Sequence, residues 1–317
     1  MTADSHLIIL SNGVKVPKLA YGTGTKWFRR DGTSDLEKPD ASVNQELVDS
    51  ILTALRAGFT HIDAAEVYGT ETEIGLAVAQ YLKETGKPRS SLFITNKVSA
   101  PPKDIKASIA AQLKRLGPAV EGYVDLYLVH SPFWDYESPE TTLTLEKVWG
   151  DLESLVTETK QARAIGVSNW RIQDFKAIQA LNPKIQPTVN QIEFHAYNQN
   201  PTLRKHLAGE KSGVVTAAYG PLQPLVQFVE SGPVKAVVDK IAANKGPDVS
   251  GSQVLLAWGW AVGTIQVTTS SKEERLKEAV AALDIVLTAE EVEEITKAGE
   301  GIRLRKFFGD KKFSFDD

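Results

Sequence analysis

Four polar residues occur at or just after the ends of apolar runs that are typical of buried strands: Asp63, Tyr68, Lys97 and His130. The phenol of Tyr68 can donate a proton, and the Lys97 ammonium would lower the pKa of that phenol by favouring its anion. The Asp63 carboxylate can hold the ammonium, and the His130 imidazole can orient a carbonyl. Such a set suits delivery of a proton to a carbonyl oxygen while a hydride reaches the carbon. Because no side chain carries a hydride, a cofactor would be needed.

Three of these residues, taken alone, also have a purely structural interpretation. Asp63 could cap a helix, Tyr68 could pack within a loop, and His130 could be a satisfied histidine of the core. A lysine at the buried end of a strand, as Lys97 would be, is costly without a partner, and Asp63 is the natural one. The combination is more informative, because three successive strand ends should meet at one edge of a sheet.

The elements that would hold these residues alternate between apolar runs and amphipathic helical stretches. The eight runs are residues 19–22, 59–62, 92–95, 124–129, 164–167, 188–191, 214–218 and 264–267. Helical patterns include residues 43–57, 105–116, 143–159, 172–181 and 273–282. This order predicts an α/β fold, a (β/α)₈ TIM barrel, with residues 1–317 as a single domain. Two doubly wound domains are the alternative, but no Gly-, Pro- or Ser-rich linker divides the chain.

Both ends of the chain and one inner loop carry further signals. Runs 7–10 and 14–16 flank Asn12-Gly13, which predicts a β-hairpin that caps one end of the barrel. A final helix over 289–298 should begin with a capping box formed by Thr288 and Glu291. The loop 131–139 is rich in aromatic residues, and loops after barrel strands surround the active site. Those aromatics are candidate pocket walls, although packing of the loop onto a helix is an equal alternative.

Composition and missing motifs exclude several classes of protein. The net charge of −4 lacks the basic excess of a nucleic-acid or membrane-surface protein. The chain has no cysteine, and its five histidines are scattered, so no metal site is predicted. The longest apolar stretch, 254–262, is too short for a membrane span, and the N-terminus does not read as a signal peptide. We therefore expect a cytoplasmic protein. No glycine fingerprint of a Rossmann fold, P-loop, zinc-protease or serine-hydrolase motif is present.

The motifs around the four residues resemble those of the aldo-keto reductases. The segment GFTHIDAAEVYG (58–69) resembles the family signature, and LVHSP (128–132), IGVSN (165–169) and VNQIEFH (189–195) resemble three further motifs. The resemblance runs in order from about residue 7 to residue 308. The segment VTTSSKEERLKE (267–278) is most similar to that of the fungal NADPH-dependent dicarbonyl reductases, which reduce conjugated polyketones and ketopantoyl lactone.

The resemblance implies a TIM barrel that binds NADPH without a Rossmann fold and assigns the four residues as a catalytic tetrad. It implies that Ser168, Asn169 and Gln191 hold the nicotinamide carboxamide and that Tyr219 stacks on the ring. The other residues implied at the cofactor are Gly24, Thr25, Pro221, Leu222, Thr268, Thr269, Ser270, Ser271, Lys272 and Arg275. The last four of these would surround the 2′-phosphate, at the start of a helix whose N–H groups suit an anion. A solvated helix face is the alternative interpretation of Lys272 and Arg275.

The chain also departs from the family pattern. Many relatives have Pro-Lys-Ser where this chain has Thr268-Thr269-Ser270, so Lys272 would replace the usual phosphate-binding lysine, and Ala279 stands where relatives often have an asparagine. Ser131 replaces an aromatic residue, which would widen the pocket, and Trp27, Phe133 and Trp134 are the predicted substrate walls. The segment after Tyr219 lacks a long clamp over the pyrophosphate, which predicts fast exchange of the cofactor.

Together these observations predict an NADPH-dependent reductase of aldehydes and ketones, with α-dicarbonyls, keto lactones or keto esters as substrates. We expect a monomer or weak dimer whose partner is a small carbonyl compound. One alternative is a cofactor-binding regulatory subunit of the same family with little turnover. Another is a barrel aldolase with Lys97 as a Schiff base, which the neighbouring Asp63 disfavours because a nucleophilic lysine must be neutral.

Overall fold

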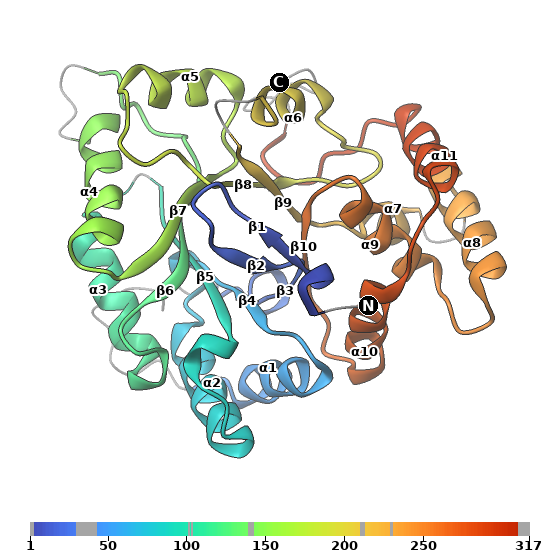
Figure 1. Cartoon of the computed structure of the whole chain (residues 1–317), viewed down its shortest axis with the longest axis horizontal. Helices are drawn as coiled ribbons and strands as arrows, with labels where there is room; N and C mark the ends of the chain where they lie inside the picture. Colours follow the sequence, from blue (N-terminus) through green and yellow to red (C-terminus); the bar gives the residue numbers. More distant parts are fainter. Residues whose placement is uncertain are drawn as a thin grey trace.

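A computed structural model of the chain shows eight parallel strands closed into a barrel with helices around it (Figure 1). The structure describes residues 3–29, 43–100, 102, 104–138, 143–209, 213–228 and 231–309. The strands are β3 (Leu19–Gly22), β4 (His61–Asp63), β5 (Phe93–Val98), β6 (Val124–Val129), β7 (Ala162–Ser168), β8 (Val189–Glu193), β9 (Val215–Tyr219) and β10 (Ile265–Thr268). They pair in this order around the barrel, and β10 closes it against β3. The predicted TIM barrel is confirmed, and the doubly wound alternative is not what the chain adopts.

Eleven α-helices lie in the described part of the chain. They are α1 (Gln45–Ala57), α2 (Glu71–Thr85), α3 (Ile105–Leu116), α4 (Leu145–Thr157), α5 (Ile172–Ala180), α6 (Pro201–Leu207), α7 (Gln223–Gln227), α8 (Pro233–Lys245), α9 (Gly251–Ala261), α10 (Glu273–Ala281) and α11 (Ala289–Glu300). Short 3₁₀ helices are η1 (Ala3–His6), η2 (Thr25–Trp27), η3 (Glu66–Tyr68), η4 (Arg89–Ser91), η5 (Pro118–Val120) and η6 (Ala282–Asp284). Of these helices, α8 and α11 lie side by side at the outer edge (Figure 1).

Six of the eight predicted strand ends fall one to three residues too early, and two of them lie at predicted catalytic residues. The prediction ended the second and third barrel strands at residues 62 and 95, but β4 includes Asp63 and β5 continues through Lys97 to Val98. Charged residues are rare within buried strands because desolvation of a charge is costly. Here the two side chains pair with each other, so the strands can continue through them.

The predicted N-terminal hairpin is present as β1 (Leu7–Ile9) and β2 (Lys15–Pro17), which pair antiparallel. Its turn uses Gly13 at φ +84°, a conformation that suits glycine. The hairpin brings apolar side chains to the inside of the barrel. That inner cluster consists of Leu10, Val16, Phe93, Leu126, Leu128, Ala164, Val189, Ala217 and Ile265. The inside of the barrel is therefore packed, which leaves its mouth available for chemistry.

The helices pack on the outer face of the barrel, and residues that suit helix ends cap several of them. Asn44 caps α1, and Gly58 ends it at φ +113°. At α11 the predicted capping box is formed, since Thr288 Oγ1 accepts from Glu291 N at 3.2 Å and Glu291 Oε2 accepts from Thr288 N at 2.8 Å. The helix runs two residues beyond the predicted end, to Glu300.

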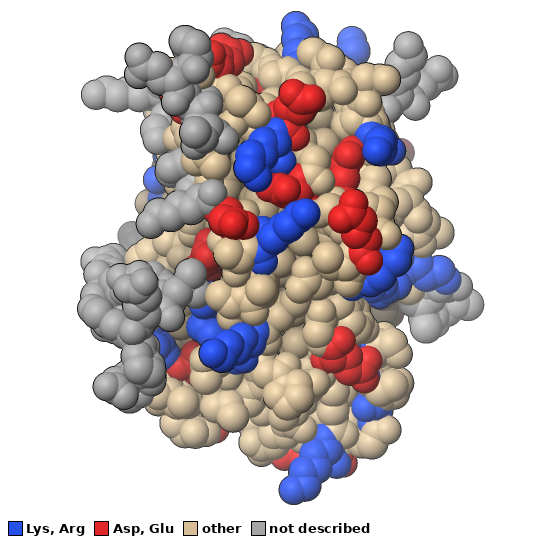
Figure 2. All heavy atoms as spheres, turned by 90° about the vertical axis from the view of Figure 1, so that its left-hand side faces the viewer, with Lys and Arg blue, Asp and Glu red and all other residues tan. Residues whose placement is uncertain are grey.

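On the face that Figure 2 shows, the described residues form no large surface patch of a single charge. Lys and Arg side chains are interspersed there with Asp and Glu side chains (Figure 2). Within the described ranges, no helix is long and apolar enough to span a membrane, and no group of His, Asp or Glu residues could hold a metal ion.

Candidate active site

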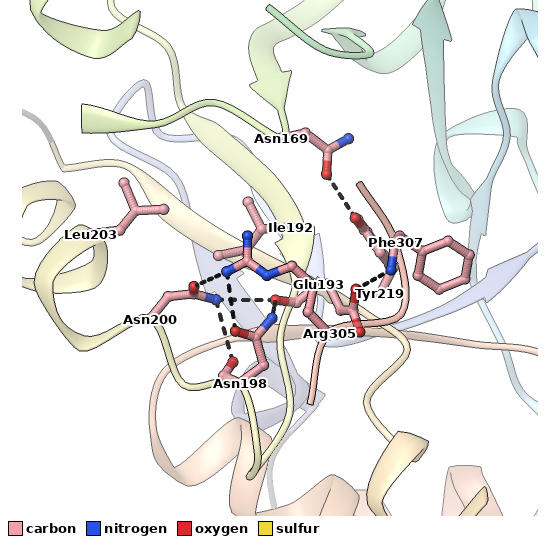
Figure 3. Close-up of a pocket in the computed structure, with 9 residues that line it drawn as sticks. All are labelled: Asn169, Ile192, Glu193, Asn198, Asn200, Leu203, Tyr219, Arg305 and Phe307. Atoms are coloured by element: carbon pink, nitrogen blue, oxygen red, sulfur yellow. Dashed lines mark hydrogen bonds between the residues drawn. The ribbon is translucent and has the colours of Figure 1, made fainter. Parts of the chain in front are cut away.

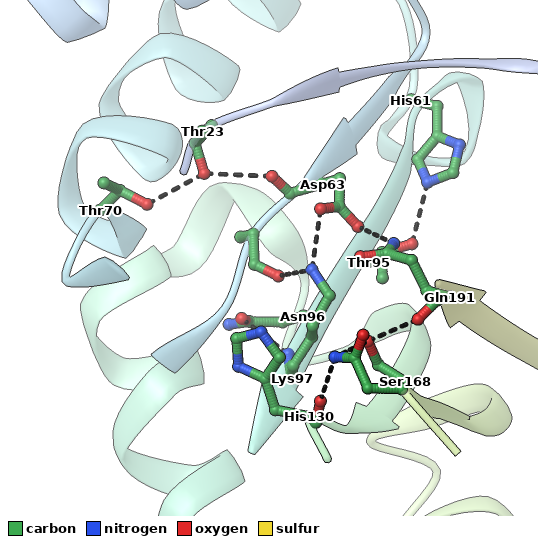
Figure 4. A network of polar contacts seen from close by, with 12 residues as sticks. Thr23, His61, Asp63, Thr70, Thr95, Asn96, Lys97, His130, Ser168 and Gln191 are labelled. Atoms are coloured by element: carbon green, nitrogen blue, oxygen red, sulfur yellow. Dashed lines mark hydrogen bonds and ion pairs between the residues drawn. The ribbon is translucent and has the colours of Figure 1, made fainter. Parts of the chain in front are cut away.

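Three of the four predicted catalytic residues meet at the carboxyl ends of neighbouring strands (Figure 4). Asp63 is the last residue of β4, Lys97 is next to last in β5, and His130 directly follows β6. Tyr68 lies in η3, which follows β4, so the phenol comes from a loop above the strands. The tyrosine remains partly exposed at the barrel mouth. The structure therefore brings all four residues to one place, as the spacing predicts.

The Asp63–Lys97 pair forms the buried base of this site. Lys97 Nζ donates to Asp63 Oδ1 at 2.7 Å and to the backbone oxygen of Ala64 at 2.8 Å. The side chains of Lys97 and Asp63 are 0% and 4% exposed. Burial works against the charge of Lys97, but the Asp63 carboxylate and the Tyr68 hydroxyl together outweigh it and raise the pKa of Lys97 above its usual value. The ammonium is therefore charged and fixed, which is unsuited to a nucleophilic lysine.

The Tyr68 ring lies near both the ammonium and the imidazole. Lys97 Nζ is 5.3 Å from the centroid of the Tyr68 ring, and the Tyr68 and His130 ring centroids are 5.7 Å apart at 80°. The predicted net lowering of the Tyr68 pKa is wrong. Burial raises this pKa above its ordinary value, and the Lys97 charge, which lowers it as expected, is the smaller effect. The consequence still suits a proton donor, because Tyr68 keeps its proton at neutral pH.

His130 is neutral at physiological pH. Burial, and to a lesser extent the Lys97 charge, lower the pKa of His130 to about 3. A neutral imidazole has one N–H to donate and one nitrogen that accepts. The His130 backbone is held on both sides, since its N–H donates to Val98 O at 3.0 Å and its carbonyl accepts from Asn169 Nδ2 at 2.9 Å.

Gly24, predicted at the cofactor, lies directly against the Tyr68 ring. A Cβ atom on Gly24 would stand 2.9 Å from the ring atom Cζ, closer than real Cβ contacts. We therefore expect Gly24→Ala to displace the Tyr68 hydroxyl and to lower kcat by up to about 10²-fold, as a misplacement of about 1 Å can. The measurement is kcat with a carbonyl substrate, next to the melting temperature.

The matched control for this prediction is Gly150→Ala in α4. A Cβ atom at Gly150 would meet no atom within 4 Å. In the middle of a helix the added methyl should leave activity unchanged and slightly stabilise the fold. Full kcat in Gly24→Ala would show that the Tyr68 ring tolerates the shift.

The residues that the resemblance assigned to the nicotinamide, its carboxamide or its ring, lie on or directly after β7, β8 and β9. Ser168 Oγ donates to Gln191 O at 2.8 Å, and the Tyr219 hydroxyl donates to Asn169 Oδ1 at 2.7 Å. Asn169 has φ +61°, a conformation that asparagine tolerates. Hydroxyl and amide groups of this kind match the donor and acceptor of a primary amide. The residues present therefore fit a nicotinamide carboxamide.

Gln191 also makes a contact that the sequence analysis missed. Its Nε2 donates to Asp63 Oδ2 at 2.7 Å, so the second oxygen of the buried carboxylate is satisfied (Figure 4). Gln191 lies 128 residues from Asp63 in the chain, and no local pattern signals such a pair. The amide thus joins the predicted carboxamide site to the Asp63–Lys97 pair.

The predicted phosphate-binding residues surround the start of α10. Ser271, Lys272 and Arg275 are exposed, and no carboxylate among the described residues forms an ion pair with either cation. The neighbouring Glu273 is already paired with Lys277 at 2.7 Å. Ser270 Oγ accepts from Lys272 N at 3.0 Å and shapes the turn that follows β10. Two exposed cations at a helix N-terminus fit a phosphate group.

The remaining cofactor positions frame the same mouth. Thr25 is exposed in η2, Pro221 is buried, and Leu222 is partly buried before α7. Thr268 ends β10 and is partly buried, as is Thr269.

The three predicted substrate walls differ in exposure. Trp27 is only 5% exposed and belongs to the main core cluster. Trp134 is partly buried, and its Nε1 donates to Leu143 O at 3.1 Å. Phe133 is partly exposed and packs against Phe308, with ring centroids 5.2 Å apart.

Two aromatic residues near the mouth were missed. Phe28 and Phe308 are each 38% exposed, and the Phe28 ring meets the Tyr68 ring edge-on at 6.2 Å. The unusual Phe307-Phe308 pair in the tail was the available signal for the second of them.

His61, two residues before Asp63 on β4, makes stability depend on pH. It is 2% exposed, and its ring nitrogens lie 3.2 Å from Pro17 O and 2.8 Å from Thr95 Oγ1. Burial lowers the pKa of His61 to about 4. Between pH 4 and 6.5 the unfolded chain therefore binds a proton that the folded chain does not, and stability falls as the pH falls.

At pH 5 we expect this histidine alone to cost about 2 kcal/mol of stability relative to neutral pH. Urea unfolding of His61→Gln between pH 5 and 7.5 should therefore show a smaller slope of stability against pH than the wild type. Equal slopes would mean that His61 is not the group that titrates.

Comparisons with known proteins agree with this geometry. Residues 24–300 match the model of the aldo/keto reductase family. The chain is 36% identical over 303 residues to an NAD/NADP-dependent indole-3-acetaldehyde reductase of Schizosaccharomyces pombe, covering 95% of this chain and 98% of the relative. It is 37% identical over 329 residues to an NADPH-dependent alpha-keto amide reductase of Saccharomyces cerevisiae, covering 98% and 97%. A crystal structure of an aldo/keto reductase from Brucella melitensis superposes with a TM-score of 0.74 at 28% identity, covering 94% of this chain and 99% of that one.

Proposed function

The chain belongs to the aldo/keto reductase family, and from that premise we propose that it reduces aldehydes and ketones to alcohols with NADPH. The observation that carries the proposal is the meeting of the buried Asp63–Lys97 pair with Tyr68 and His130 at the barrel mouth. A fixed cation, a protonated phenol and a neutral imidazole are what protonation of a carbonyl oxygen requires.

In this proposal Tyr68 is the general acid. Lys97 favours the phenolate that remains after proton transfer, and Asp63 keeps the ammonium charged and in place. His130 donates a hydrogen bond to the substrate oxygen and sets its direction towards the Tyr68 hydroxyl. NADPH, when bound, supplies the hydride.

The cofactor would be held at both ends of the mouth. Ser168, Asn169 and Gln191 offer hydrogen bonds to the carboxamide, and Tyr219 offers its ring to one face of the nicotinamide. At the other end, Ser270, Ser271, Lys272 and Arg275 would surround the 2′-phosphate, which favours NADPH over NADH.

Substrates with an activated carbonyl fit this site best in our proposal. The related proteins are named for an aldehyde that bears an indole ring and for an alpha-keto amide. The mouth of this chain carries the partly exposed aromatics Phe28, Phe133 and Phe308. We infer α-dicarbonyls, keto lactones, keto esters and aldehydes with apolar substituents.

The test is the rate of cofactor oxidation with a panel of these carbonyls, using NADPH and NADH at equal concentrations. We expect turnover that is faster with NADPH than with NADH when both are at low concentration. Tight NADPH binding without turnover of any carbonyl would favour the regulatory-subunit alternative. Trapping of a substrate adduct on Lys97 by borohydride would favour the aldolase.

Arg275 gives this proposal a sharper prediction. Loss of a charged hydrogen bond to phosphate costs about 1.5–3 kcal/mol, so Arg275→Met should raise the KM for NADPH by roughly 10- to 100-fold and leave the KM for NADH unchanged. The control is Lys297→Met, which removes an exposed cation on α11. An equal change in both KM values would show that Arg275 does not contact the 2′-phosphate.

A further inference from the structure

A narrow pocket behind Tyr219 is closed on one side by the C-terminal segment (Figure 3). Its walls come from Asn169, Ile192, Glu193, Asn198, Asn200, Leu203, Tyr219, Arg305 and Phe307. The pocket has room for little more than a water molecule, so it is too small for a substrate. The residues around the pocket matter because their contacts join residues 305–307 to the ends of β8 and β9.

Glu193, the last residue of β8, anchors this segment through its backbone. The Glu193 carboxylate is 4% exposed. Its Oε1 accepts from Lys306 N at 2.7 Å, and its Oε2 accepts from Phe307 N at 2.8 Å. His195 Nε2 lies 3.2 Å from Oε1. A buried carboxylate is costly unless its oxygens are bonded, and here both oxygens hold consecutive N–H groups of one segment.

Arg305 fastens the same segment beside Glu193. Its Nη2 donates to Asn198 Oδ1 at 3.3 Å and to Asn200 Oδ1 at 3.1 Å (Figure 3). The amides of those two asparagines donate in turn to the backbone oxygen of Glu193, at 2.9 and 3.1 Å. The position of the segment is therefore fixed relative to the end of β8.

The anchored segment brings an aromatic ring into contact with Tyr219, one of the proposed cofactor residues. Phe307 meets the Tyr219 ring edge-on, with centroids 5.5 Å apart at 81°. The Tyr219 hydroxyl donates to Asn169 Oδ1, and Asn169 Nδ2 donates to the backbone oxygen of His130. A continuous series of contacts therefore runs from Glu193 through Phe307, Tyr219 and Asn169 to the catalytic histidine.

We propose that Glu193 is a positioning residue for carbonyl reduction. Glu193 holds the N–H groups of Lys306 and Phe307 and so keeps the Phe307 ring against Tyr219. This contact keeps the side chains of Tyr219 and Asn169 in the positions that the nicotinamide requires. This inference rests on the proposed function, in which Tyr219 and Asn169 contact the cofactor. Glu193 contacts neither substrate nor cofactor and acts only through the segment that it anchors.

The test compares Glu193→Gln, Phe307→Ala and the double variant with the wild type. The amide introduced by Glu193→Gln would turn an NH₂ group towards one of the two backbone N–H groups, so the anchor would lose one bond while the side-chain volume stays the same. We expect each single variant to raise the Kd for NADPH about tenfold, measured by titration without substrate, and to change kcat less than about threefold. If both residues act in one series, the double variant should bind no more weakly than either single variant.

Two further measurements separate anchoring from cofactor binding. Without cofactor, trypsin should cleave the wild-type chain after Lys306 more slowly than it cleaves Glu193→Gln. Lys306→Ala keeps the backbone N–H that Glu193 holds, so it should bind NADPH like the wild type. Phe307→Leu should recover part of the lost affinity, because it restores an apolar contact with Tyr219. These Phe307 variants test the idea even if Glu193→Gln does not fold.

The outcomes distinguish this inference from the proposed function. A wild-type protein that binds no dinucleotide would refute both. Wild-type binding with the same Kd in Glu193→Gln and Phe307→Ala would overturn only the positioning role. Faster cleavage of Glu193→Gln with unchanged NADPH affinity would reduce Glu193 to a structural anchor of the tail, which also overturns the proposal.

Discussion

Replacing Tyr68 by phenylalanine is expected to lower kcat by roughly 10²–10⁴-fold and to leave the affinity for NADPH unchanged. The substitution removes only the hydroxyl, so the ring keeps its contacts with Gly24, Phe28 and His130. The proposed contacts to the carboxamide and the 2′-phosphate come from other elements, β7, β8 and the start of α10. The measurement is kcat for an α-dicarbonyl, together with the Kd for NADPH from fluorescence titration.

The pH dependence of the wild type is part of the same expectation. Because burial raises the pKa of Tyr68 above its ordinary value of 10.0, the hydroxyl stays protonated over the neutral range. The rate of reduction should therefore show no loss from deprotonation of Tyr68 until the pH passes about 10. Tyr123→Phe, directly before β6 at the opposite end of the barrel, is the matched control and should keep full activity. Near-normal kcat in Tyr68→Phe would exclude Tyr68 as the proton donor.

Removing the ammonium of Lys97 is the second change with a large expected effect. In Lys97→Met the Asp63 carboxylate would remain buried with Gln191 as its remaining side-chain donor. Removal of one partner of a buried ion pair typically destabilises a protein by about 3–5 kcal/mol. We therefore expect a loss of this size in the free energy of unfolding in urea, together with loss of nearly all turnover.

A double-mutant cycle separates the two roles of the pair. Asp63→Asn combined with Lys97→Met removes both charges, so the double variant should regain much of the stability but none of the activity. If the double variant is as unstable as the sum of both single changes, the pair does not act as a unit in folding. If Lys97→Met turns over normally, the cation has no role in proton transfer.

Much of this architecture could be predicted from the chain because its signals are local. Apolar runs of strand length, separated by amphipathic stretches, predict the barrel, and the capping box formed by Thr288 and Glu291 is readable from one short segment. The pairing of Lys97 with Asp63 followed from the cost of burying an unpaired lysine. That argument used only residue types and the expectation that neighbouring strand ends meet.

What the sequence could not predict depends on burial and on distant contacts. The direction of the Tyr68 pKa shift is set by how deeply the ring is buried, which no spacing encodes. The contact of Gln191 with Asp63 spans 128 residues, and that of Glu193 with Phe307 spans 114. Neither pair leaves a periodic pattern. Trp27, which the resemblance suggests as a substrate wall, is only 5% exposed, and no spacing encodes that burial.

The central claim is that the Tyr68 hydroxyl delivers a proton to a carbonyl whose carbon receives a hydride from bound nicotinamide. The most direct test is single-turnover oxidation of enzyme-bound NADPH by an α-dicarbonyl, followed by stopped-flow absorbance in the wild type and in Tyr68→Phe. We predict rapid oxidation of one equivalent of NADPH by the wild type and oxidation at least about 100-fold slower by the variant. Equal rates in the two proteins, or no oxidation by the wild type, would contradict it.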